Sequence, residues 1–177
     1  MKYQVYQMLK SVSCFEYSEA DTVRIRFAET FAAVSKLPAV RSSGLLKRLK
    51  YVFEATRRFP AMLDAWRRGD IAKGGEIFRL DGIGLRNDYE ISGPELDAMC
   101  DIVRPIPGVL GERMLGGGDK GAAGAIVLAH AEKAVQNAVE AEYPKRFPAL
   151  AGKFSAYGLN IVDGVKLFED VSDLREE

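Results

Sequence analysis

The sequence feature that most limits the possible folds is a cluster of glycines in the segment GERMLGGGDKG, residues 111–121. Residues 109–114, directly before the glycines, are predicted to form a strand. Glycine accepts positive φ angles and lets a ligand or another backbone approach closely. A plain connection between two strands needs only one or two glycines, and this turn has four. We therefore predict that the turn faces a ligand, with a purely structural turn as the alternative.

The predicted site is a turn that lies close to a phosphate or to a nucleotide-binding loop. Successive backbone amides in such a turn can hold an anion, and a lysine within it adds positive charge. An arginine in the preceding strand could contribute as well, or could belong to a structural ion pair. An aspartate in the turn would oppose an anion unless it points away or pairs with the lysine. The predicted residues are Gly116, Gly117, Gly118, Lys120 and Gly121, with Arg113 and Asp119 as further candidates.

Other site chemistries find less support in the sequence. The same glycines satisfy the dinucleotide pattern G-x-G-x-x-G, with Glu140 near the distance expected for a ribose contact. That pattern belongs to the first turn of a strand–helix–strand unit, whereas here a long helical stretch precedes it. The mononucleotide P-loop pattern does not occur. His130 is predicted to be a cap or surface residue, and no catalytic or metal-binding residues are predicted.

Composition narrows the class of protein. The 177 residues suffice for one domain with a sizeable core. Lys plus Arg and Asp plus Glu both number 25, and this balance argues against a nucleic-acid or acidic-membrane partner. Cys14 and Cys100 are far apart and lack metal-type spacing, which suits a reducing compartment. We therefore expect a cytoplasmic protein without a signal peptide or membrane span.

Hydrophobic periodicity and turn residues predict the order of the elements. A first helix starts at Ser18 or Asp21 and ends at Pro38, and a longer one starts at Ser42 or Ser43 with a break or kink at Pro60. Further helices are expected through Ile71–Phe78, from a capping box at Ser92 and Glu95 to Val103, and over Ala131–Tyr143. Strands are expected at Tyr3–Tyr6, Val109–Met114, Ile126–Leu128, Phe154–Val162 and Val165–Phe168, with a hairpin turn at Asp163-Gly164. A helix is the alternative for Ile126–Leu128.

Short turns between the late strands favour an α+β fold, a mainly antiparallel sheet with helices packed on one face. Residues 1–177 are predicted to form a single domain.

The order of short motifs along the chain resembles that of the galactokinases, within the GHMP kinase superfamily. In that family an arginine-rich helix and a Gly-Asp pair precede a Ser-x-Pro-Glu-Leu-Asp helix start and a Gly-x-Arg-Met-Thr-Gly-Gly-Gly strand and turn. The resemblance is specific from about Arg57 to Phe168. It rests on Gly69-Asp70, Leu85-Arg86, Tyr89, Ser92, Pro94-Glu95-Leu96-Asp97, Gly111, Arg113-Met114, Gly116-Gly117-Gly118 and Asp163-Gly164.

The resemblance implies a GHMP-kinase C-terminal-type domain over residues 1–177, without the N-terminal nucleotide-binding half. It implies ATP-dependent phosphoryl transfer to a sugar hydroxyl when the two halves combine, with ATP and Mg²⁺ as cofactors that this chain alone is not expected to bind. The expected partners are the missing half or a second copy of the chain, and a sugar substrate. A non-catalytic binding or regulatory relative is the alternative.

The sequence departs from the family at several informative positions. Leu115 stands where the family has threonine, and Asp119-Lys120 replaces Phe-Gly. Asp81-Gly82 occupies the position of a Ser-His pair, and Ala20 aligns with a sugar-contacting tyrosine. Alanine lacks that hydroxyl group, so galactose is not assured as the substrate.

Overall fold

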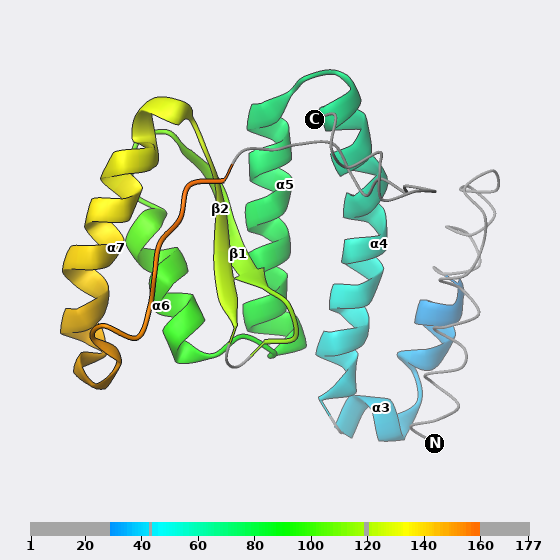
Figure 1. Ribbon diagram of the computed structural model, residues 1–177. Coiled ribbons are helices and arrows are strands. Elements are labelled where there is room, and N and C mark those ends of the chain that lie inside the picture. Colours follow the sequence, from blue (N-terminus) through cyan, green and yellow to red (C-terminus); the bar gives the residue numbers. More distant parts are fainter. Residues whose placement is uncertain (1–28, 43, 119–120, 160–177) are drawn as a thin grey trace, which may run out of the picture.

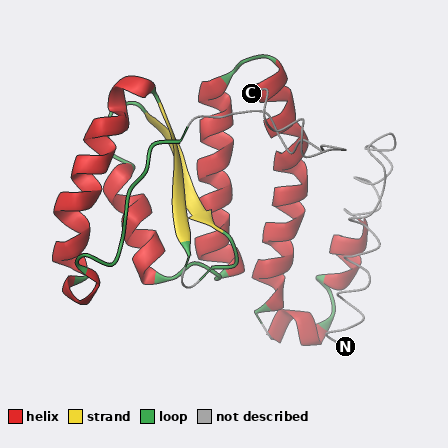
Figure 2. Cartoon of the chain, in the orientation of Figure 1, coloured by secondary structure: helices red, strands yellow, loops and turns green. Residues whose placement is uncertain are grey.

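The computed structural model describes residues 29–42, 44–118 and 121–159 (Figures 1 and 2). Residues 29–34 are helical. They are followed by α3 (Pro38–Ser42), α4 (Leu45–Arg67), α5 (Ile71–Gly84), the π-helical turn η2 (Leu85–Tyr89), α6 (Pro94–Val103), β1 (Val109–Leu115), β2 (Ala122–Val127), η3 (Ala129–Ala131), α7 (Glu132–Arg146) and η4 (Pro148–Leu150).

The two described strands form an antiparallel sheet, and the glycine turn lies between them in the sequence. Gly111 pairs with Ile126 and Leu115 with Ala122, and the register shifts between Val109 and Gly111. Figure 1 shows α5 on one side of the strands and α6 and α7 on the other. The predicted α+β class with an antiparallel sheet is confirmed, whereas the helices lie on both sides of the two strands and not on one face as predicted. The strand predicted at Ile126–Leu128 is present and starts earlier, at Ala122.

Helix α5 lies unusually close to β1 because glycines face each other across the contact. A Cβ atom on Gly111 would collide with the carbonyl group of Gly75, and its distance to the Gly75 carbonyl carbon would be 2.7 Å. One on Gly82 would lie 2.7 Å from the carbonyl oxygen of Glu112. The helix and strand backbones therefore touch directly, an approach that only residues without a side chain allow.

Apolar side chains fill the spaces on both sides of the sheet. The largest cluster joins α6, β1 and α7 through its buried members Ile102, Val103, Val109, Val139 and Tyr143. A second cluster, Leu85, Leu96 and Met114, packs under the end of β1. A third joins the first described helix to α3 and α4 through Val34, Val40 and Leu49. The end of β1 is therefore anchored on buried side chains just before the glycine turn.

The start of α6 differs from the prediction. The capping box at Ser92 and Glu95 is wrong, because Gly93 is the N-cap and no side chain caps the helix. The Ser92 hydroxyl instead donates to Oδ1 of Asp97 at 2.6 Å. Pro94 occupies the first helical position, where a missing amide costs nothing.

Two other predictions also differ from the structure. Helix α4 continues without a break through Pro60 to Arg67, although proline cannot donate to the carbonyl group one turn earlier. The strand predicted from Phe154 is not formed over residues 154–159, which have no ladder partner. Phe154 and Ala156 pack into the α6–α7 core, and this contact produces the alternating burial without a neighbouring strand. Tyr3–Tyr6, the first helix start and the Asp163-Gly164 hairpin lie outside the described residues.

Replacement of Gly111 by alanine tests the close contact between α5 and β1. The new methyl group must displace the carbonyl group of Gly75, so we expect a loss of at least about 1–3 kcal/mol in the free energy of unfolding. Urea denaturation measures the change. Gly117→Ala is the matched control, since a Cβ there meets nothing within 4 Å. Equal stability of the two variants would contradict the packing described.

Candidate functional site

The glycine turn begins at the end of β1. At two of its positions the local structure requires a glycine. Gly116 and Gly118 adopt φ angles of 81° and 87°, which side-chain-bearing residues rarely accept. Gly118 also lies against the backbone of Ile91, where a Cβ atom would collide with the carbonyl oxygen. The loop between η2 and α6 thus supports the far side of the turn. Gly121 directly precedes β2.

Within the described chain, neither the backbone conformation nor a close contact requires a glycine at position 117. Its φ angle is not positive, and a Cβ atom there would meet nothing within 4 Å. Its backbone is therefore open at the surface between two constrained neighbours. An open glycine between two structurally required ones suits the approach of an anion or of another backbone. Asp119 and Lys120 lie outside the described residues.

The structure places Arg113 in an ion pair that turns away from the glycine turn. Its Nη1 donates to Oδ2 of Asp81 in α5, and its Nε donates to the carbonyl oxygen of Met114 at 3.0 Å. The guanidinium group also stacks 5.5 Å from the centre of the Phe78 ring. Of the two roles considered for Arg113 from sequence, the structure contains the structural ion pair.

Asp81 joins Arg113 to helix α4. Arg58 donates to Oδ1 of Asp81 through Nε and Nη2 at 3.2 and 2.9 Å. The Tyr51 hydroxyl donates to Oδ2 at 3.4 Å. Asp81 is only 14% exposed, and this partly buried carboxylate accepts hydrogen bonds from two arginines and a phenol. We call Asp81, Arg58, Arg113 and Tyr51 the Asp81 cluster.

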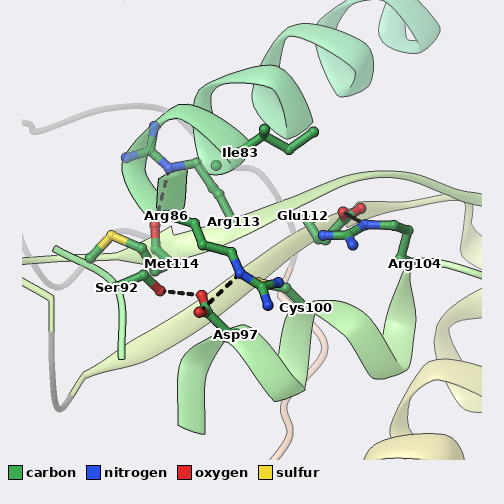
Figure 3. A pocket seen from close by; sticks show the side chains of 10 residues that line it. Ile83, Arg86, Ser92, Asp97, Cys100, Arg104, Glu112, Arg113 and Met114 are labelled. Carbon is green, nitrogen blue, oxygen red and sulfur yellow. Dashed lines mark hydrogen bonds and ion pairs between the residues drawn. The ribbon is translucent and has the colours of Figure 1, made fainter. Parts of the chain in front are cut away.

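Glu112, next to Arg113, points in the opposite direction. Its side chain is 1% exposed and accepts from Nε of Arg79 at 2.9 Å and from Nε of Arg104 at 2.6 Å. Arg79 belongs to α5 and Arg104 follows α6. Figure 3 shows Arg104 beside Glu112. A buried carboxylate needs such partners, because desolvation without them is costly. Consecutive residues of β1 therefore fix the strand to helices on both sides.

A shallow pocket lies over this part of β1, between α5 and α6 (Figure 3). Arg86 at its rim is paired with Asp97 and Asp101, at 3.1 and 3.0 Å. Cys100 lines the floor, and burial, followed by the charge of Glu112, raises the pKa of its thiol to about 11. The pocket's arginines are thus neutralised by neighbouring carboxylates, and it offers less to an anion than the open backbone at Gly117.

Two other features, a metal-type cluster and a membrane-spanning helix, are absent from the described ranges. No group of three His, Cys, Asp or Glu side chains there is placed to hold a metal ion. No helix in these same residues combines the length and apolar character needed to cross a lipid bilayer.

Sequence reasoning did not identify the Asp81 cluster or the partners of Glu112. A usable signal was present, since Glu112-Arg113 interrupts a strand whose neighbours are buried. Charged residues in such a strand require buried partners of opposite sign. The spacing of Tyr51 and Arg58, seven residues apart, places them on one face of a helix and could have suggested one of those partners.

Replacement of Glu112 by glutamine tests the buried pairing. The change leaves Arg79 and Arg104 without their shared carboxylate, and we expect a loss near the lower end of about 3–5 kcal/mol in unfolding free energy, since both arginines reach solvent. Urea denaturation provides the measurement. Glu142→Gln, which removes an exposed pair with Lys145, is the control and should cost at most about 1 kcal/mol. A similarly small loss for Glu112→Gln would refute the role given to this carboxylate.

Tyr51 provides a pH test of the Asp81 cluster. Burial, followed by the negative charge of Asp81, raises its pKa from 10.0 to about 12. The neutral phenol therefore favours the folded state, and its contribution is complete below pH 10 and lost as the pH rises toward 12. Stability should fall less steeply over this range in Tyr51→Phe than in the unmodified chain. Parallel curves for the two proteins would show that Tyr51 ionises as freely when folded as when unfolded.

Part of the sequence of known galactokinases is similar to this chain. No protein-family model matches the chain. The galactokinase of Limosilactobacillus fermentum is 37% identical over 137 residues, which are 77% of this chain and 34% of that protein. The galactokinase of Halalkalibacterium halodurans is 30% identical over 137 residues, 77% of this chain and 33% of that protein.

A solved structure gives the same result. The crystal structure of Lactococcus lactis galactokinase complexed with galactose matches with a TM-score of 0.61 and 30% sequence identity. The match covers 68% of this chain and 30% of that one. The chain thus spans about a third of the length of the relatives it matches. The resemblance inferred from sequence is confirmed, and the chain is homologous to one segment of the galactokinases.

Proposed function

We propose that this chain is the C-terminal domain of a galactokinase-like sugar kinase, which transfers a phosphoryl group from ATP to a sugar hydroxyl when combined with an N-terminal half. The observation that carries the proposal is the open glycine turn, at the end of an antiparallel strand, in a chain homologous to part of the galactokinases. Phosphoryl transfer depends mainly on positioning and on electrostatic stabilisation. A domain that presents a fixed turn of backbone amides can supply the first of these.

The proposed contribution of this domain is to shape the phosphate-binding region. The amides around Gly117 would face either the phosphate groups or the nucleotide loop of the other half. The cofactors would be ATP and Mg²⁺, whose chemistry is neutralisation of charge on the transferred phosphoryl group. The described part of the chain contains no three-residue cluster for a metal. The resemblance places the nucleotide-binding half outside this chain, and we propose that the metal ligands lie there.

The proposed partner is a polypeptide that carries the nucleotide loop, on the same protein or on another chain. Exposed apolar residues support a surface for association. Trp66 and Ile71, at the connection between α4 and α5, are 59% and 58% exposed. Exposed apolar groups of this size are typical of surfaces that a partner covers. From the cysteine content we propose the cytoplasm as the compartment.

A kinase assay on the chain alone and with its partner tests the function. We expect no sugar-dependent ADP formation by this chain alone, because it lacks a recognisable nucleotide loop. Addition of the remaining segment of a galactokinase relative should restore turnover, and Gly117→Val should lower it by about tenfold or more, in line with the cost of a misplaced active-site group.

The matched control is Ala151→Val, which adds similar bulk at an exposed position after η4. Its turnover in the assembled kinase should equal that of the unmodified chain. The proposal fails if the chain alone turns over sugar. It also fails if Gly117→Val folds normally and supports full activity.

A non-catalytic relative that only binds a partner or an anion is the second candidate. Two observations favour it: Arg113 is occupied by Asp81, and Leu115 replaces the family's threonine at the start of the turn. The same assay separates the candidates, because a binding module would associate with the kinase segment without restoring ADP formation.

A further inference from the structure

The side chain of Arg113 contacts the backbone next to the glycine turn. Its Nε bonds to the carbonyl oxygen of Met114, so the arginine is tied to the backbone of the residue that follows it. Met114 is 2% exposed, and the exposed Leu115 is the last residue of β1. The orientation of the Met114 carbonyl group helps to set the path of the chain into Gly116. Any group that fixes Arg113 therefore acts on the glycine turn.

Asp81 is the group that fixes Arg113. It is held in turn by Arg58 and Tyr51, which both belong to α4. The side chains of Arg58, Asp81 and Arg113 are 17%, 14% and 25% exposed, so water weakens these bonds only partly. The missing side chain of Gly82 lets α5 bring Asp81 directly onto β1. The carboxylate on α5 is therefore anchored by side chains from two other elements, α4 and β1.

We propose that Asp81 is a positioning residue for the glycine turn, acting through Arg113 and the Met114 carbonyl group. It keeps the guanidinium group of Arg113 directed into the Asp81 cluster and away from the turn, so that the amides around Gly117 are presented in one arrangement. The effect on the turn follows from the contacts alone. The effect on phosphoryl transfer rests on the proposed function.

Removal of the negative charge should release the turn rather than unfold the domain. In Asp81→Asn, Arg58 and Arg113 keep their positive charges and lose the carboxylate that neutralised both. Repulsion between them would favour movement of the more exposed Arg113, and the bond to the Met114 carbonyl group would be lost with it. No member of the Asp81 cluster belongs to the α6–α7 core, so that core should remain intact.

Amide hydrogen exchange in the full chain provides the test. For Asp81→Asn we expect exchange at Met114 and Leu115, the paired residues of β1 that lead into the turn, to be faster by about tenfold or more, with exchange in α7 unchanged. Asp81→Glu, which keeps the charge, should restore most of the protection. Arg113→Gln should loosen the turn in the same way, and the double variant with Asp81→Asn should add little, because both changes break one linkage.

Asp101→Asn is the matched control. Asp101 also pairs with two arginines, Arg86 and Arg104, but on the α6 side of the sheet. Its replacement should leave exchange at Met114 and Leu115 unchanged. The proposal is overturned if Asp81→Asn leaves these two amides as protected as before, or if exchange rises equally there and in α7, which would indicate a general loss of stability.

The assembled kinase separates this proposal from the proposed function. A looser turn should raise the KM for ATP more than it lowers kcat, since a positioning defect weakens nucleotide binding first. If exchange at Met114 and Leu115 rises while both constants stay unchanged, the role of Asp81 stands and the phosphate-site assignment is wrong. If exchange does not change, the role of Asp81 is wrong whatever the kinetics.

Discussion

Direct contact between the backbones of α5 and β1 is the constraint on which the remaining structure depends. Gly75 and Gly111 meet without side chains between them, and Gly82 repeats the arrangement two turns further along the helix. Close approach strengthens short-range packing and brings polar groups of the two elements within reach of one another. Asp81 is the neighbour of Gly82, so this close approach also brings its carboxylate to Arg113 of β1. The glycines thus determine the packing and, through it, the electrostatics.

The strand carries two adjacent charges of opposite sign into this packed region. Glu112 pairs with Arg79 of α5 and with Arg104, which follows α6, whereas Arg113 pairs with Asp81 of α5. A buried charge with its partners in place resists movement, because loss of one partner leaves an uncompensated charge. The end of β1 is consequently rigid, whereas Gly117 beyond it is open. A fixed strand followed by an open turn is an arrangement suited to binding, and it is the physical basis of the proposed function.

The sequence predicted those parts of the fold that depend on local pattern. Strand β1, the glycine turn and helix α7 follow from turn residues and hydrophobic period, and the motif order predicted the homology. The prediction was wrong where tertiary packing produced the alternating burial that is typical of a strand. At Phe154 this alternation comes from packing against helices. Sequence reasoning did not identify Asp81 as the partner of Arg113, because pairing between residues 32 apart depends on a helix–strand contact that no local pattern encodes.

The central claim is that the glycine turn is the part of this domain that meets the other half of a sugar kinase. Amide chemical shifts of the isotope-labelled chain, recorded before and after addition of the remaining segment of a galactokinase relative, test it most directly. The account predicts that the largest shifts occur at Gly116, Gly117 and Gly118 and that those of α7 stay in place. Shifts concentrated on α7, with the glycine turn unaffected, would contradict it.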